Sequence, residues 1–231
     1  MADAKQMSVP MAIVVAGALI AGAVYFSKVT PAPAVAPVPT PALEQARPTA
    51  SLDISPITSE DHVRGPENAK VTIVEYSDLE CPYCKVFHQS MLQLIKEYPS
   101  DVRWVYRHAP IAQLHAKAAA EANASECAAE QGKFWEFTDV VFAATPSNDG
   151  LNLADLSKYA AQAGVANVAE FQACVDSQKF AATVQADLDD GLKAGLQGTP
   201  FNMVITADGT KTQLGGGVPY EQLKATIAPL L

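Results

Sequence analysis

The part of this 231-residue sequence most suited to chemistry is a pair of cysteines separated by two residues. Cys81 and Cys84 enclose Pro82 and Tyr83 in the segment DLECPYCKVF. Such a pair can form a catalytic disulfide, a structural disulfide or half of a zinc site. A zinc site would need a second close cysteine pair, which this sequence lacks, so we interpret the pair as redox-active and expect no metal.

The elements around the pair favour a reactive thiol. VTIVEYS, residues 71–77, is apolar on both faces and predicts a central strand. Apolar residues then recur at helical spacing, which predicts a helix from Pro82 to Tyr98. Cys81 therefore begins a helix, where free N–H groups and the helix dipole favour its thiolate. Cys84, one turn further, is placed to resolve a mixed disulfide.

Glu75 shares a predicted strand face with Val71 and Ile73, which should lie under a helix. A buried carboxyl group tends to have a raised pKa, so Glu75 could relay a proton to or from the Cys84 thiol. The alternative is a carboxylate at the rim of the sheet, paired with a lysine.

Thr199-Pro200 directly precedes a predicted strand. A cis proline there could lie beside the cysteine pair and leave backbone groups free to bind a substrate peptide. Pro82 and Tyr83 would contribute to the same binding surface. The alternative is an ordinary trans proline at the beginning of a strand.

The remaining pattern predicts a second strand at 102–108, a hairpin of strands 201–206 and 211–216 around Asp208-Gly209, and a closing helix from Tyr220 to Leu230. Between them lies an alanine-rich region that predicts about five helices, with breaks near Gly132, Pro146 to Gly150, Gly164 and Ser177. This order indicates an α/β thioredoxin-type fold with an inserted α-helical domain at about 112–197.

The other cysteines, Cys127 and Cys174, lie in this helical region, and we expect them to form a structural disulfide. The alternative is a second redox pair that exchanges electrons with the first. The four histidines, His62, His88, His108 and His115, show no metal-ligand spacing. We interpret each as a surface or packing residue.

The N-terminal composition indicates export. Residues 9–27 predict a transmembrane anchor or a cleaved signal sequence, after a cytoplasmic N-terminus at 1–8. A Pro- and Ala-rich linker follows at 28–56, and the folded domain is expected at 57–231. All four cysteines lie in that domain, which suits an oxidising compartment. The net charge of −9 argues against a nucleic-acid partner.

Four segments together resemble the DsbA-like thiol–disulfide oxidoreductases of the thioredoxin superfamily: DHVRGPENAKVTIVEYSDLECPYCKVFH, RHAPIAQLHAKAAAEA, EQGKFWEFTDVVFA and GLQGTPFNMVI. The resemblance covers about residues 59–231. It implies Cys81 as nucleophile, Cys84 as resolving thiol, Pro200 as cis proline and Glu75 as buried acid. It departs from the strongly oxidising members at Tyr83, because they carry a histidine between the cysteines.

These observations favour an oxidase that donates the Cys81–Cys84 disulfide to cysteine-containing exported proteins and needs no cofactor. It would be a monomer with a single-pass anchor in the inner membrane, a periplasmic catalytic domain and a membrane redox partner, either quinone-linked or an electron donor. One alternative is a reductase or isomerase that a membrane electron donor keeps reduced. Another is a Cu(I)-binding thiol chaperone.

Overall fold

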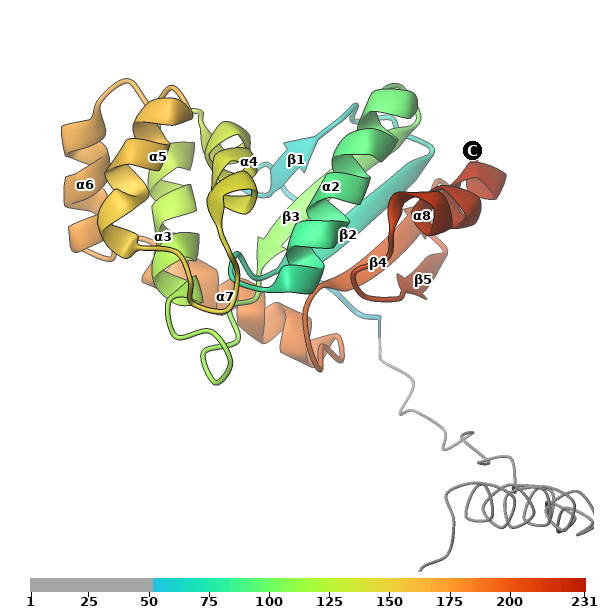
Figure 1. Ribbon diagram of the computed structural model, residues 1–231. Coiled ribbons are helices and arrows are strands. Elements are labelled where there is room, and N and C mark those ends of the chain that lie inside the picture. Colours follow the sequence, from blue (N-terminus) through green and yellow to red (C-terminus); the bar gives the residue numbers. More distant parts are fainter. Residues whose placement is uncertain (1–51) are drawn as a thin grey trace, which may run out of the picture. The chain divides into compact units, whose positions relative to one another are not determined.

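The computed structural model describes residues 52–231, which form a five-stranded mixed sheet surrounded by seven α-helices (Figure 1). The expectations for residues 1–8, for the anchor at 9–27 and for the linker up to residue 51 lie outside the described residues. Within 52–231, no helix combines the length and the apolar character that crossing a membrane requires.

The sheet has the order β1-β3-β2-β4-β5. The central strand β2 (Val71–Ser77) pairs in parallel with β3 (Val102–His108) and antiparallel with β4 (Phe201–Thr206). The edges are β5 (Lys211–Leu214), antiparallel to β4, and β1 (His62–Arg64), antiparallel to β3. The predicted strands 71–77, 102–108 and 201–206 are confirmed, whereas β5 ends two residues before the expected 216.

Both faces of the central strands are covered, as the apolar pattern of β2 predicts. Helices α2 (Pro82–Glu97) and α8 (Tyr220–Ile227) pack on one face through residues such as Phe87 and Leu223. Helix α7 (Ala181–Lys193) lies against the other face, where a second apolar cluster contains Val74, Tyr76 and Val105. Ile54 is buried in that second cluster, so packing against the sheet already includes residues before 57.

Four helices between β3 and α7 form a lobe beside the sheet, at the left of Figure 1. They are α3 (Ala118–Ala129), α4 (Phe134–Ala144), α5 (Leu156–Gln162) and α6 (Val168–Asp176). Short 3₁₀ turns occur at Leu153–Asp155 and Ala228–Leu230. With α7, the region contains the five helices that the sequence predicts, and the chain breaks fall at the predicted residues.

Cys127 on α3 and Cys174 on α6 form a disulfide with a Cα–Cα distance of 5.8 Å. The bond joins two neighbouring helices of the lobe, and both cysteines are buried. Cys81 and Cys84 lie in a different part of the domain, at the start of α2, and are free thiols.

We predict that replacing both Cys127 and Cys174 by alanine destabilises the domain without stopping thiol chemistry. The bond closes a segment with a sequence separation of 47, for which chain entropy gives about 4 kcal/mol as an upper estimate. Thermal unfolding by circular dichroism should show a lower Tm, by up to about 10 °C. Oxidation of a dithiol test peptide should continue at a near-normal rate. Loss of turnover with an unchanged fold would instead support electron exchange between the two pairs.

Candidate active site

The site is built at the C-terminal end of β2, where the chain turns directly into α2. Cys81 is the residue that precedes the helix, with extended backbone angles of φ −78° and ψ 123°, and Pro82 occupies the first helical turn. The Cys81 N–H donates to the Asp78 carbonyl at 3.1 Å, which closes the turn. Proline suits this position because the first N–H groups of a helix have no intrahelical partner.

The Cys81 thiol is acidified by its neighbours. Its pKa is lowered from 9.0 to about 6, chiefly by a hydrogen bond from the Cys84 thiol. Burial opposes the shift, while Thr199 and the backbone N–H groups of Tyr83 and Cys84 add to it. Cys81 is thus mainly a thiolate at neutral pH, which is the nucleophilic form.

Cys84 has the opposite character. It is fully buried on α2, and burial together with the charge on Cys81 raises its pKa well above 9.0. The Asp78 N–H lies 3.4 Å from its sulfur. The pair therefore consists of one thiolate and one protonated thiol, so Cys84 must lose a proton before it can attack a mixed disulfide.

Glu75 lies on the same sheet face as the cysteine pair and is fully buried. Burial raises its pKa from 4.5 to about 8, although hydrogen bonds such as that from Trp104 Nε1 to Glu75 Oε2, at 3.0 Å, act in the opposite direction. The Glu75 charge contributes to the raised Cys84 pKa, and the Cys81 charge contributes to the raised Glu75 pKa, so the carboxyl group interacts with both thiols. A carboxyl group with this pKa can exchange a proton with Cys84 near neutral pH. The carboxyl group is in the interior, so the alternative of a rim carboxylate does not apply.

The chain approaches the pair again at Thr199-Pro200, where the peptide bond is cis. The Cys81 sulfur lies 3.4 Å from the Thr199 carbonyl oxygen. On the other side of the pair, Gly217 packs against the Tyr83 backbone, and a Cβ at position 217 would be 2.5 Å from the Tyr83 carbonyl oxygen. Tyr83 itself is 65% exposed. Thr199, Pro200 and Tyr83 therefore belong to the rim of one site, although they come from distant parts of the sequence.

Two residues that sequence reasoning missed support this site, namely Asp78 and His115. Asp78 Oδ2 accepts hydrogen bonds from the Ile111 N–H and lies 2.9 Å from His115 Nδ1, so it ties the loop after β3 to the start of α2. Burial opposes protonation of His115, but Asp78 outweighs it and the Cys81 charge contributes, so the His115 pKa is raised. The only indication of this contact in the sequence was Asp78 itself, an acidic residue that follows the apolar segment before Cys81.

A second feature that the sequence did not indicate is a pair of buried carboxyl groups, those of Glu80 and Glu121. Glu80 accepts a hydrogen bond from the Leu151 N–H at 3.1 Å, and its other oxygen lies 3.3 Å from Thr145 Oγ1. The neighbouring Glu121 has its pKa raised to about 10, first by burial and then by Glu80. Glu121 is therefore protonated at neutral pH. Glu80, the residue before Cys81, links the start of α2 to the helical lobe through its contacts with Leu151 and Thr145.

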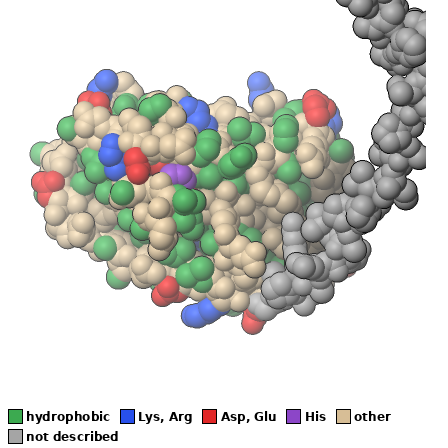
Figure 2. All heavy atoms as spheres, turned by 60° about the horizontal axis from the view of Figure 1, so that its bottom comes forward, with side chains coloured by type: hydrophobic (Ala, Val, Ile, Leu, Met, Phe, Trp, Pro, Cys, Tyr) green, Lys and Arg blue, Asp and Glu red, His purple; other side chains and the backbone are tan. Residues whose placement is uncertain are grey.

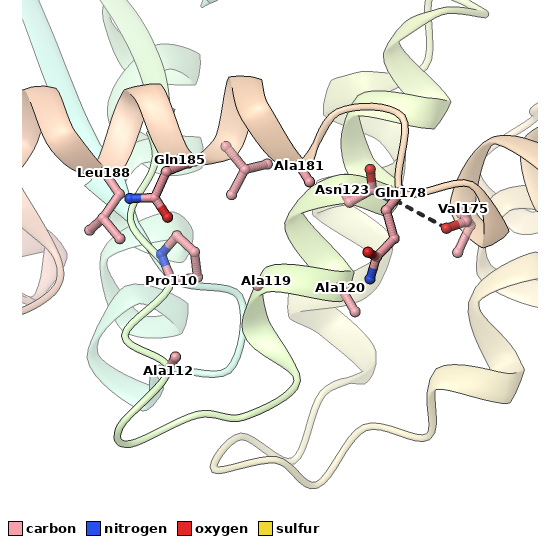
Figure 3. A pocket seen from close by; sticks show the side chains of 11 residues that line it. Pro110, Ala112, Ala119, Ala120, Asn123, Val175, Gln178, Ala181, Gln185 and Leu188 are labelled. Carbon is pink, nitrogen blue, oxygen red and sulfur yellow. Dashed lines mark hydrogen bonds between the residues drawn. The ribbon is translucent and has the colours of Figure 1, made fainter.

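The hollow drawn in Figure 3 lies between α3 and α7 and has a volume of about 270 Å³. It is lined largely by apolar side chains, among them Ala119 and Ala120 from α3 and Leu188 from α7. None of its lining residues belongs to the cysteine site. It offers no nucleophile, so we assign the chemistry to the cysteines.

Histidines are more organised than their sequence spacing indicates. His62 on β1 and His108 at the end of β3 direct Nε2 at the same oxygen of Glu126 on α3, at 2.7 and 2.9 Å. These residues are the group within 52–231 whose ligand atoms converge closely enough for a metal ion. His88 contacts Asp139 at 2.8 Å. The interpretation of the histidines as surface or packing residues therefore left out their carboxylate partners.

We predict that Glu75→Gln makes the domain more stable at high pH. The pKa of Glu75 is about 8 in the folded state and about 4.5 when unfolded, so the folded state holds the extra proton between these values. Stability therefore falls as pH rises from about 4.5 to about 8, and the glutamine removes that loss. The gain above pH 8 should be on the order of a few kcal/mol in chemical unfolding, and near zero below pH 4.5. A pH-independent effect would contradict the assignment.

We predict that Cys81 titrates with a pKa near 6, as measured by thiolate absorbance against pH. His115→Gln should raise this pKa by a few tenths of a unit, because the interaction between His115 and the Cys81 thiolate is mutual. His88→Gln is the matched control, since His88 is a buried histidine on α2 that pairs with Asp139. Equal effects of the two variants would show that the His115 effect is not specific.

The sequence profile of the thioredoxin family matches residues 58–228. Among solved structures, DsbA2 of Pseudomonas aeruginosa is 26% identical, with a TM-score of 0.61, over 77% of this chain and 97% of that protein. Oxidised BdbD from Bacillus subtilis is 24% identical, with a TM-score of 0.64, over 74% of this chain and 92% of BdbD, and it supports the fold alone.

Curated relatives match a smaller part of the chain. The Na(+)/H(+) antiporter NhaA 3 of Salinispora tropica is 40% identical over 140 residues, which is 61% of this chain and 21% of the antiporter. NhaA of Herminiimonas arsenicoxydans is 39% identical over the same shares. The chain thus spans about a fifth of the length of these relatives. Together, the family profile and the paired cysteines at the start of α2 show that the chain belongs to the thioredoxin family, with a structure similar to that of DsbA2.

Proposed function

We propose that this protein is an oxidase that transfers the Cys81–Cys84 disulfide to cysteine pairs of exported proteins. The observation that carries the proposal is the asymmetry of the pair, in which the Cys81 pKa is lowered to about 6 and that of Cys84 is raised. A stabilised thiolate favours the reduced form of the pair, and a disulfide whose reduced form is stabilised is a good oxidant.

The reaction begins when a client thiolate attacks the sulfur of Cys81. A mixed disulfide forms, the Cys81–Cys84 bond breaks, and Cys84 leaves as a thiolate. Glu75 supplies a proton to Cys84, because its pKa of about 8 keeps it largely protonated at neutral pH. A second client thiolate then attacks the client sulfur of the mixed disulfide and releases the Cys81 thiolate. Two electrons have moved from the client to the cysteine pair.

The strength of the oxidant follows from the Cys81 thiolate. Comparable thiols titrate at about 7 in thioredoxin and about 3.5 in DsbA, and the value of about 6 lies between them. Tyr83 adds no positive charge where a histidine would. We therefore place the reduction potential between roughly −270 and −120 mV.

The surface at the site suits an extended, partly apolar client. Tyr83 and Val86 are exposed on the first turns of α2, and Leu114 is 70% exposed in the loop after β3. Figure 2 shows the lower face of Figure 1, where hydrophobic side chains alternate with uncharged surface and most charged side chains lie toward the rim. In this proposal, backbone groups next to the cis Pro200 pair with such a peptide.

We further propose that residues 9–27 anchor the protein in the inner membrane, with the domain in the periplasm and a quinone-linked membrane partner that reoxidises it. The Cys127–Cys174 disulfide supports an oxidising compartment, because such bonds are rare in the cytosol. The apolar segment at 9–27 and the proline-rich spacer that follows support a tethered domain.

We predict that equilibration with glutathione, followed by thiol alkylation and mass spectrometry, gives a reduction potential between roughly −270 and −120 mV. The measurement is made on the natural chain and on the Cys127→Ala/Cys174→Ala variant. In the variant, Cys81–Cys84 is the one pair of cysteines that can be oxidised or reduced. Cells should hold Cys81–Cys84 mainly oxidised. A potential at or below that of thioredoxin, or a pair that cells keep reduced, would replace the oxidase with a reductase or isomerase.

Trapping separates the roles of the two cysteines. Cys84→Ser should accumulate mixed disulfides with exported proteins, which form when the Cys81 thiolate attacks a client disulfide and persist because the resolving thiol is absent. Cys81→Ser should accumulate none, since the remaining Cys84 is buried and has a raised pKa. Mixed disulfides on Cys81→Ser alone would reverse the assignment.

A further inference from the structure

A second cluster of side chains with chemical potential lies away from the cysteines, where β1, β3 and α3 meet. His62 Nε2 and His108 Nε2 lie 2.7 and 2.9 Å from Glu126 Oε1, and the three ligand atoms are all within 4.8 Å of one another. The residues are separated by up to 64 positions in the sequence. Their convergence is a product of the fold, because β1 pairs with β3 and Glu126 on α3 contacts both histidines.

Neighbouring rings fix the direction of both imidazoles. His62 stacks on Phe134, with ring centroids 3.4 Å apart and planes at 7°. The ring of His108 meets that of Tyr106 edge-on at 5.3 Å, and it is 1% exposed. A ring held in this way keeps its Nε2 aimed at one point without further cost in side-chain entropy.

The cluster borders a hollow of about 480 Å³ that is open to solvent and rich in carboxylates. Arg107 pairs with Asp61 at 2.7 Å and with Asp190 at 2.8 Å, so these two carboxylates are neutralised. Glu126 contacts the His62 and His108 imidazoles, and Asp187 accepts a hydrogen bond from the His108 N–H. In all, five carboxyl groups and one arginine line the hollow. The wall beside the imidazoles therefore attracts cations.

We propose that His62, His108 and Glu126 bind one divalent transition-metal ion, with Zn²⁺ as the expected ion, and leave its remaining position open to the hollow. Two imidazole nitrogens and one carboxylate oxygen are a donor set suited to Zn²⁺. Bonds of about 2.0–2.2 Å require the ligand atoms to separate by roughly half an ångström from their hydrogen-bonded distances. Side-chain rotation of Glu126 supplies this movement without changing the backbone.

The position of the site indicates what the ion does. It would join the sheet, through β1 and β3, to α3 in the helical lobe. Glu126 is adjacent to Cys127, so α3 would be held at neighbouring residues by the ion on one side and by the disulfide to α6 on the other. An ion that binds the folded chain and not the unfolded chain stabilises the fold by mass action. We therefore assign the ion a structural role, distinct from the cysteine chemistry.

The test is calorimetric titration of ZnCl₂ into the tag-free, chelator-treated protein with both cysteine pairs oxidised. Oxidation removes thiols as competing ligands. We expect one Zn²⁺ per chain with a micromolar or lower Kd, and a Tm raised by several degrees. His62→Gln should weaken binding at least tenfold, because glutamine keeps a hydrogen-bond donor and loses the nitrogen ligand. His88→Gln, at a histidine paired with Asp139, is the matched control and should bind normally.

A second measurement keeps the proposal testable if a variant unfolds. Histidine ring resonances of the natural chain should shift for His62 and His108 on addition of Zn²⁺, while those of His88 and His115 stay in place. Absence of saturable binding would overturn the proposal. So would binding that His62→Gln leaves unchanged, since the ion would then bind elsewhere. A site that takes Ca²⁺ in preference to Zn²⁺ would also overturn it, since that preference indicates oxygen ligands alone.

Discussion

The chemistry of the site depends on the position of the Cys81 sulfur at the first turn of α2. Cys81 receives N–H groups from Tyr83 and Cys84 only because α2 begins at Pro82, and α2 begins there because β2 ends at Ser77. The central strand is buried on both faces, so it fixes the starting point of the helix rigidly. The rest of the fold supplies the contacts of this turn: the loop before β4 brings Thr199 to the sulfur, and the loop after β5 brings Gly217 against the Tyr83 backbone.

The environment separates two chemically identical side chains. Cys81 lies where N–H groups and a neighbouring thiol lower its pKa, whereas Cys84 is enclosed by apolar groups and by the acidic Glu75. Burial alone would raise the pKa of both thiols. The difference between them therefore arises from hydrogen bonding, which lowers the Cys81 pKa, and from the deeper burial of Cys84, which outweighs its hydrogen bond from the Asp78 N–H. Glu75 completes the arrangement, because a carboxyl group with a pKa of about 8 can hold or release a proton under the conditions in which the protein works.

Much of the fold could be predicted from the sequence because its main strands and helices have strong periodic patterns. The apolar run at 71–77 and the recurring apolar residues of α2 defined their elements within a residue or two. The three-residue strand β1 could not be predicted, because HVR has neither length nor alternation and its side chains are only partly buried. Because β1 could not be predicted, the contact between His62 on β1 and the Glu126 carboxylate could not be predicted either. Similarly, Asp78 and His115 lie 37 residues apart, and their contact follows from the turn after β3, which no sequence period encodes.

The hydrogen bond between Trp104 and Glu75 also couples the site to tryptophan fluorescence. The chain has two tryptophans, and the indole N–H of Trp104 donates directly to Glu75, the carboxyl group to which we assign proton exchange with Cys84. The second, Trp135, lies 4.7 Å from Trp104 between ring centroids. Indole emission responds to a neighbouring charge, so the ionisation of Glu75 should alter the fluorescence of the whole domain. The molecule would then report each turnover of its own disulfide without an added label.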